Sequence, residues 1–223
     1  MIKLVAFDWN GTLLSDTQTA VKAENIALGK FGHKPIGIKK FRECFHIPII
    51  EYWKRMGMDE AFFQKHMNEI EKIYVNIYEN QATKCRSRAG VRQTLSWLQQ
   101  HHCRSIIYSN HIIELINHQL IRLKLKPYIR TILGRTRKDE GLLHKRSKGD
   151  KLATYVKQHG YKPSEVLSIG DTEEEIEIGK KLGYYTVGIT GGYNTEKRLK
   201  QHKPNFIIHQ MAELIKIIKH INI

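Results

Sequence analysis

Two apolar segments that each stop at a carboxylate constrain this chain of 223 residues more than any other feature. Residues 4–7 lead directly to Asp8 and a Gly-Thr turn, and residues 166–170 lead in the same way to Asp171. A continuous apolar run bounded by a turn is typical of a parallel strand that is buried on both faces. Functional groups in such sheets gather beyond the carboxyl ends of the strands. Asp8 and Asp171 are therefore predicted to share one edge of a sheet.

From about residue 86 onwards the pattern alternates between strands and helices. It predicts strands over 104–110, 129–134, 185–190 and 205–208, and helices over 91–98, 113–120, 151–159 and 211–218. One more helix opens at the acidic residues 173–175. This alternation predicts an α/β fold with a doubly wound parallel sheet.

Nothing between residue 14 and about residue 85 resembles a buried strand. Asp16 and Asp59 can each cap a helix. In the helix after Asp59 the apolar residues recur at helical spacing, which is typical of core packing: Phe63, Met67, Ile70, Tyr74 and Ile77. We therefore predict an all-helical insert over residues 15–85 within an α/β core formed by residues 1–14 and 86–223.

Composition narrows the class of protein. The net charge of +15 is compatible with anionic substrates, but Lys and Arg are spread along the whole chain without an aromatic-basic motif, which argues against a nucleic-acid partner. No apolar stretch approaches the ~18 residues of a membrane span. We therefore expect no membrane association and a cytoplasmic location. Cys44, Cys85 and Cys103 lack metal-ligand spacing and are predicted to be free thiols.

Polar residues that suit phosphate chemistry follow the predicted strands. Ser109 and Asn110 end one strand, Lys148 precedes a helix, and Glu175 follows Asp171 by one helical turn. A carboxylate that attacks phosphorus needs a divalent metal, because two anions must come together. A hydroxyl and an amide can hold phosphate oxygens, and a lysine can neutralise charge in the transition state. Carboxylate oxygens suit Mg²⁺.

These motifs resemble those of the haloacid dehalogenase superfamily, in its phosphoglycolate-phosphatase-like subgroup with a helical (C1-type) cap. Residues 8–13, Asp-Trp-Asn-Gly-Thr-Leu, resemble its first motif, and Ser109-Asn110 match its second. Lys148, with Lys151 as a spare, resembles the third, and residues 170–175 resemble the fourth. The resemblance covers the full length and implies a Rossmann-like core with an inserted helical cap.

The resemblance also implies a function and a set of site residues. It implies a Mg²⁺-dependent phosphatase that hydrolyses a small phosphorylated metabolite through an aspartyl-phosphate on Asp8. The implied metal ligands are Asp8, the backbone carbonyl of Asn10, Asp171 and Glu175. The implied phosphate-binding residues are Thr12, Ser109, Asn110 and Lys148, with Lys148 bridging the nucleophile and the phosphate. Neither the substrate nor the oligomeric state is specified by the sequence.

Asn10 departs from the family pattern, in which an aspartate protonates the leaving oxygen and then activates water. An amide cannot act as a general acid or base, a role that contributes ~10²–10⁴-fold in rate. Three alternatives follow. Hydrolysis is restricted to good leaving groups, or another base such as His46, His111 or His144 assists it. In the second alternative the chain binds a phosphorylated ligand with slow or no turnover. In the third it is a phosphonatase-type C–P hydrolase that forms a Schiff base on Lys22 or Lys54.

Seven Lys and Arg residues fall between positions 135 and 151. This stretch is either a solvated loop or a basic rim that attracts polyanionic substrates such as nucleotides or bisphosphates. In the second case, raised ionic strength should increase the Michaelis constant steeply.

Overall fold

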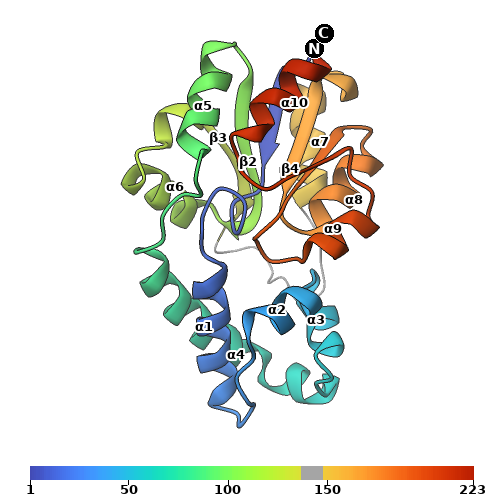
Figure 1. Cartoon of the computed structure of the whole chain (residues 1–223). Coiled ribbons are helices and arrows are strands. Elements are labelled where there is room, and N and C mark those ends of the chain that lie inside the picture. The colour runs from blue at the N-terminus through green and yellow to red at the C-terminus, as the bar shows by residue number, and fades with distance from the viewer. Residues whose placement is uncertain (137–147) are drawn as a thin grey trace.

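A parallel six-stranded sheet forms the centre of the computed structural model, which describes residues 1–136 and 148–223 (Figure 1). The strands are β1 (Leu4–Phe7), β2 (Arg104–Ile112), β3 (Thr131–Arg135), β4 (Val166–Gly170), β5 (Tyr185–Ile189) and β6 (Phe206–Ile208). Their order is β3-β2-β1-β4-β5-β6, and all neighbouring pairs are parallel. The predicted doubly wound parallel sheet is confirmed. Most of the predicted basic stretch, including His144, lies outside the described residues.

Helices cover both faces of the sheet because successive strand residues point to opposite sides. Val5 and Phe7 of β1 belong to a core shared with α5 (Val91–Gln100), α6 (Ile113–Arg122) and α10 (Glu213–Ile221). Leu4 and Ala6 belong to a second core, shared with α7 (Lys148–Gln158) and the apolar side of α8 (Glu173–Lys181). The central strand is thereby buried on both faces, as its apolar run predicts.

The structure differs from the sequence prediction in several element bounds and in one additional helix. Lys148 lies within helix α7, whereas the sequence prediction placed it before the helix. A short helix, α9 (Glu196–Gln201), was not predicted, since its six residues contain a single apolar side chain, Leu199, and carry no periodic pattern. Two 3₁₀ turns, η1 (Lys126–Tyr128) and η2 (Pro163–Glu165), complete the α/β part.

Four helices form a separate lobe beyond one end of the sheet (Figure 1). They are α1 (Thr17–Gly29), α2 (Ile38–Cys44), α3 (Ile49–Arg55) and α4 (Glu60–Ala82), and we call them the helical lobe. The lobe has its own apolar core. Two chain segments join it to the sheet and run side by side, with Ser15 N donating to Arg86 O at 2.9 Å. The boundaries of independent folding units at residues 15 and 85 stay a prediction.

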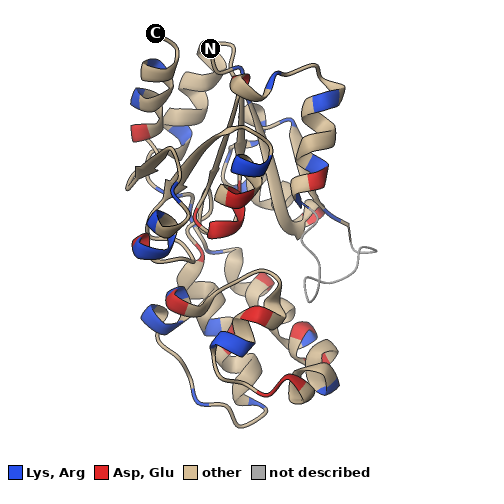
Figure 2. Cartoon of the chain, turned by 90° about the vertical axis from the view of Figure 1, so that its right-hand side faces the viewer, with Lys and Arg blue, Asp and Glu red and all other residues tan. Residues whose placement is uncertain are grey.

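The distribution of charged side chains and the length of the apolar helices bear on whether nucleic acid or a membrane could be a partner. Lys and Arg are distributed over both the α/β part and the helical lobe and alternate with acids in the view of Figure 2. Among the described residues no helix combines the length and apolar character needed to cross a membrane. The three cysteines are buried and form no disulfide, as predicted.

Candidate active site

The predicted polar residues meet at the carboxyl ends of β1, β2 and β4. Because β1 pairs with both β2 and β4, the residues that follow these strands lie next to one another. Asp8 follows β1, Ser109 and Asn110 lie in the last part of β2, and Asp171 follows β4. This edge of the sheet faces the helical lobe (Figure 1).

Lys148 is the cation at the centre of this edge, and only 3% of it is exposed. Its Nζ lies 3.1 Å from Asp8 Oδ1 and 3.0 Å from Glu174 Oε2, and it also contacts Glu175 Oε1. Lys151, the spare candidate, instead donates to Gly134 O at 2.6 Å. The structure therefore places Lys148, and not Lys151, beside the predicted nucleophile.

Burial and repulsion oppose ionisation of the carboxylates at this edge. Burial raises the pKa of Asp8 well above its ordinary value, Lys148 lowers it, and the charges of Glu175 and Asp171 raise it again. Burial works to lower the pKa of Lys148, but Asp8, Glu174 and Glu175 outweigh it and hold that pKa well above its ordinary value. Lys148 is therefore charged and compensates several buried acids at once.

Replacing Lys148 with methionine should lower the free energy of unfolding by about 3–5 kcal/mol, because the buried carboxylates of Asp8, Glu174 and Glu175 lose the lysine that contacts them. The loss should be smaller at pH 5 than at pH 8, since the acids can take up protons as the pH falls. Urea unfolding in the presence of EDTA measures both values. Lys151→Met on the same helix is the matched control. An equal loss in both variants would contradict a special role for Lys148.

Asp171 is fully buried and firmly oriented. Its Oδ1 accepts a hydrogen bond from Thr12 Oγ1 at 2.6 Å, and its Oδ2 accepts one from Tyr193 N at 2.6 Å. Burial, followed by the charge of Glu175, raises its pKa to about 7. A side chain at Gly11, which has φ +73°, would clash with this carboxylate. The Gly-Thr turn of the first motif thus serves to hold Asp171, and the hydroxyl predicted to bind phosphate is directed at Asp171.

Asn10 is held by a carboxylate that the sequence assigned only to helix capping. Its Nδ2 donates to Asp16 Oδ2 at 2.7 Å and to Tyr78 Oη at 2.7 Å. Asp16 also accepts from Gly11 N at 2.7 Å and from the hydroxyls of Tyr78 and Tyr193. Asp16 occupies the predicted N-cap position of α1, but its side chain makes no cap hydrogen bond to that helix. The fully buried Asp16 carboxylate takes donors from the first motif instead.

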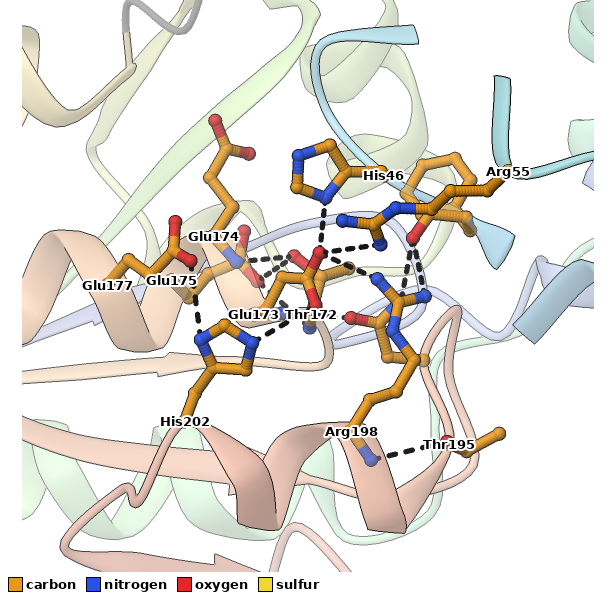
Figure 3. Close-up of polar contacts among 12 residues, drawn as sticks. His46, Arg55, Thr172, Glu173, Glu174, Glu175, Glu177, Thr195, Arg198 and His202 are labelled. Atoms are coloured by element: carbon orange, nitrogen blue, oxygen red, sulfur yellow. Dashed lines mark hydrogen bonds and ion pairs between the residues drawn. The ribbon is translucent and has the colours of Figure 1, made fainter. Parts of the chain in front are cut away.

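The three consecutive acids at the start of α8 have three different surroundings. Glu174 faces the site, where Asn110 Nδ2 donates to its Oε2 at 2.8 Å. Glu175 accepts from Thr172 N and Thr172 Oγ1 as the acid of a capping box and also contacts Lys148. Glu173 points toward the helical lobe (Figure 3). The sequence interpretation singled out Glu175 and overlooked both neighbours.

The carboxylate oxygens at this edge are the type of ligand that a hard divalent cation prefers, but they are not arranged as a complete metal site. Asp8, Asp171 and Glu175 supply only oxygen donors. The charges of Glu175 and Asp171 raise the pKa of Asp8, and the charge of Glu175 raises the pKa of Asp171, so a cation among them would relieve repulsion. Within residues 1–136 and 148–223, no three His, Cys, Asp or Glu side chains are gathered as a metal site. The set would require the backbone carbonyl of Asn10 and waters as further ligands.

A cavity of about 210 Å³ lies between this edge and the helical lobe. Asp8, Asn10, Ser109 and Lys148 line its sheet end, whereas Thr12 and Asp171 lie behind them and do not line it. Ser109 Oγ accepts a hydrogen bond from His111 N at 3.2 Å, and Asn110 Oδ1 is buried with no partner among the described residues. Ser109 and Asn110 therefore offer a hydroxyl and an amide at the cavity wall.

The alternative catalytic groups fall at different places. His111 lines the cavity, where its Nε2 lies 3.2 Å from Glu79 Oε1. His46 is bound to Glu173 and does not line the cavity. Lys22 and Lys54, nominated for Schiff-base chemistry, are exposed and do not line it either. Of these candidates, His111 alone borders the cavity in the described part of the chain.

Glu173 joins the α/β part to the helical lobe (Figure 3). From the lobe it contacts His46 and, at 3.1 Å, Arg55; from the α/β part it contacts Arg198 at 2.6 Å and His202 at 3.2 Å. Burial raises the pKa of its carboxyl, but hydrogen bonds with His46 and Arg198 outweigh burial and hold the pKa well below its ordinary value. The carboxylate thus fixes the lobe over the cavity.

Replacing Glu173 with glutamine should lower the free energy of unfolding by about 1–3 kcal/mol, the cost of removing hydrogen bonds to a charged group. Because the pKa of Glu173 is lowered, its carboxylate stabilises the folded state at pH values above the ordinary glutamate pKa of 4.5. This stabilisation is lost as the pH falls below 4.5. The difference between wild type and variant should therefore shrink on acidification. Glu196→Gln, which removes an exposed helical pair with Lys200, should change stability by only a few tenths of a kcal/mol.

Comparison with known proteins places the chain in a family. The family model described as haloacid dehalogenase-like hydrolase matches residues 5–189. A phosphoglycolate phosphatase of Pseudomonas fluorescens (strain Pf0-1) is 24% identical over 220 residues, covering 96% of this chain and 78% of that protein. A phosphoglycolate phosphatase of Photobacterium profundum is 23% identical and covers 98% of this chain and 96% of that protein.

Solved structures agree on the fold. A haloacid dehalogenase-like family protein of Streptococcus pneumoniae superposes with a TM-score of 0.81 at 18% identity, covering 97% of this chain and 98% of that one. A hydrolase of Pseudomonas syringae superposes with a TM-score of 0.79 at 18% identity, covering 98% of each chain. The α/β fold with its helical lobe is shared over nearly the full length.

Proposed function

The chain belongs to the haloacid dehalogenase-like hydrolases and is a phosphatase of that family, and we propose that it hydrolyses a small phosphorylated metabolite through an aspartyl-phosphate on Asp8. The observation that carries this proposal is the buried Asp8 carboxylate 3.1 Å from Lys148 Nζ at the wall of the cavity. A carboxylate oxygen in this position can attack phosphorus, and the lysine can offset the charge that develops.

Each remaining residue has a defined part in this proposal. Ser109 and Asn110 would hold phosphoryl oxygens from the cavity wall, and Thr12 would keep Asp171 oriented. Asp8, the carbonyl of Asn10, Asp171 and Glu175 would hold Mg²⁺, which when bound supplies the charge neutralisation that lets two anions approach. The helical lobe would exclude water, with the Glu173 contacts holding it in place.

Asn10 sets the range of substrates in this proposal. Its amide donates hydrogen bonds to Asp16 and Tyr78, but the amide is not acidic enough to transfer a proton to a leaving oxygen. Turnover would therefore favour good leaving groups such as acyl and aryl phosphates. The same feature supports a second candidate function, a protein that binds a phosphorylated ligand and releases it without useful turnover.

Purified protein with Mg²⁺ should hydrolyse acetyl phosphate, and EDTA should lower the rate on the order of 10²-fold or more, because a bound metal supplies several kcal/mol of transition-state stabilisation. Excess Mg²⁺ should restore the rate, and added NaCl of equal ionic strength should not. Phosphoglycolate, named for the relatives above, is a second substrate to assay. Saturable binding of these compounds without phosphate release would favour the binding protein, and hydrolysis unaffected by EDTA would contradict the metal assignment.

A further inference from the structure

The helical-lobe half of the cavity has a composition of its own. Its walls are mainly apolar and aromatic, with Phe41, Tyr52, Trp53 and Ile70 buried around it. Trp53 stacks on Phe63 with ring centroids 3.6 Å apart, so this wall is packed from behind. A cavity of about 150 Å³ accommodates benzene. The whole cavity, including the sheet end that would hold the phosphate, is about 210 Å³, so the organic part is limited to about a single ring with a short side chain.

Two polar groups in this apolar wall lie near each other without forming a hydrogen bond of proper geometry. Glu24 in α1 is 7% exposed and Tyr52 in α3 is 2% exposed, and both line the cavity. Glu24 Oε1 and Tyr52 Oη are buried without a partner of proper hydrogen-bond geometry among the described residues. Leaving such groups unpaired is unfavourable, and a ligand that donates hydrogen bonds here would pair them.

The charges of the lobe wall point in the same direction. Among the described lobe residues that line the cavity, the charged side chains are Glu24, Glu71 and Glu79, and none is basic. A ligand carboxylate would meet repulsion here. An ammonium group would meet a carboxylate and aromatic faces, both of which favour cations. Burial raises the pKa of Glu24 to about 7, while the nearby donors Tyr52 and Trp53 lower it; a bound ammonium would act in the lowering direction.

We propose that the substrate is a phosphate monoester whose organic part is a single apolar ring bearing an amino group, with the phosphate at Asp8 and the amino group at Glu24 and Tyr52. The inference rests on the proposed function and deepens it. Glu24 and Tyr52 become the residues that determine specificity. Phosphoglycolate, whose organic part is a carboxylate, is the opposite kind of compound.

Three aryl phosphates that differ at one end of the ring test this. They are the phosphate ester of tyramine, 4-propylphenyl phosphate and the phosphate ester of 3-(4-hydroxyphenyl)propionate, which end in an ammonium, a methyl and a carboxylate. Binding is measured by calorimetry with Mg²⁺ on the full chain carrying Asp8→Asn, which cannot turn the probes over. We expect the amine to bind about tenfold or more tightly than the propyl probe, and the carboxylate to bind most weakly.

Glu24→Gln in the same background should reduce the preference for the amine over the propyl probe to roughly one- to twofold, and Tyr52→Phe should lower affinity for the amine about threefold. Glu43→Gln, an exposed lobe residue, should leave the preference unchanged. If Glu24→Gln does not fold, Tyr52→Phe decides the matter. Equal binding of the amine and propyl probes, no binding of any probe, or an equal effect of Glu24→Gln on both would overturn the proposal.

Failure of the inference and failure of the proposed function give different results. Hydrolysis of acetyl phosphate by the wild-type protein tests the function alone. Active protein without a preference for the amine overturns the specificity inference and leaves the phosphatase standing. If the protein prefers the amine but hydrolyses none of the compounds, the inferred class of ligand is supported and the proposed hydrolysis is contradicted.

Discussion

Replacement of Asp8 by asparagine should abolish hydrolysis of acetyl and aryl phosphates, lowering kcat by roughly 10⁴-fold or more, as for the loss of other enzymatic nucleophiles. The amide keeps the shape of the side chain but cannot form the aspartyl-phosphate. Steady-state assays with Mg²⁺ measure the rate. Asp59→Asn, at the exposed cap of α4, is the control, because asparagine caps a helix as well as aspartate, and its rate should equal that of wild type.

Asp8→Asn should also have a higher free energy of unfolding than wild type in EDTA at neutral pH. The raised pKa of Asp8 means that the folded state binds a proton more tightly than the unfolded chain. Asp8 therefore stabilises the folded state at low pH, and this stabilisation is lost as the pH rises through the raised pKa of Asp8. The advantage of Asp8→Asn should grow from pH 5 to pH 8 in urea unfolding. An inactive variant that is also destabilised at every pH would not count as support for the mechanism.

Asn10→Asp should have the second-largest effect, a gain of about 10²–10⁴-fold in kcat/KM that is confined to poor leaving groups such as alkyl phosphates. The new carboxyl can protonate the leaving oxygen, which the amide cannot. It would also lie against Asp16 Oδ2, where Asn10 Nδ2 now sits at 2.7 Å. Asp16 is buried and residue 10 is half-buried, and two carboxyls at this distance share a proton, which raises the pKa of the introduced group and keeps it in the acid form.

The gain should accordingly decline as the pH rises. Plots of rate against the pKa of the leaving group, for wild type and Asn10→Asp, measure it directly. The double variant Asn10→Asp, Asp16→Asn exchanges the two side chains and restores a carboxyl–amide pair, so it should recover any stability lost by the single variant. An equal gain on acetyl phosphate and alkyl phosphates would show that leaving-group protonation is not what Asn10 lacks.

Much of the site follows from local sequence because strand ends are local features. The apolar runs before Asp8 and Asp171 predict buried parallel strands, and the topology then brings both carboxylates to one edge. Lys148 was singled out by its resemblance to a family motif, and the structure places it beside Asp8. These residues need no knowledge of distant contacts to be selected.

Other groups escape sequence reasoning because their roles depend on what faces them. Asp16 carries a helix-cap signal, yet its side chain turns to Asn10 and to tyrosines from α4 and from the loop after β5. Glu24 lies in α1 among buried apolar residues such as Ala20 and Ala27, and only the assembled lobe shows that it borders a cavity. The sequence contains both residues without indicating their partners.

The acids at the start of α8 show the division most clearly. Acidic residues in the first turn of a helix are favourable because they complement the helix dipole. This argument applies equally to Glu173, Glu174 and Glu175 and does not distinguish them. Successive residues of a helix project about 100° apart, so the three carboxylates reach the lobe contact, the cavity and the cap of their own helix. Local sequence determined that acids begin this helix, whereas only the packing of α8 against the sheet and the lobe decided what each acid does.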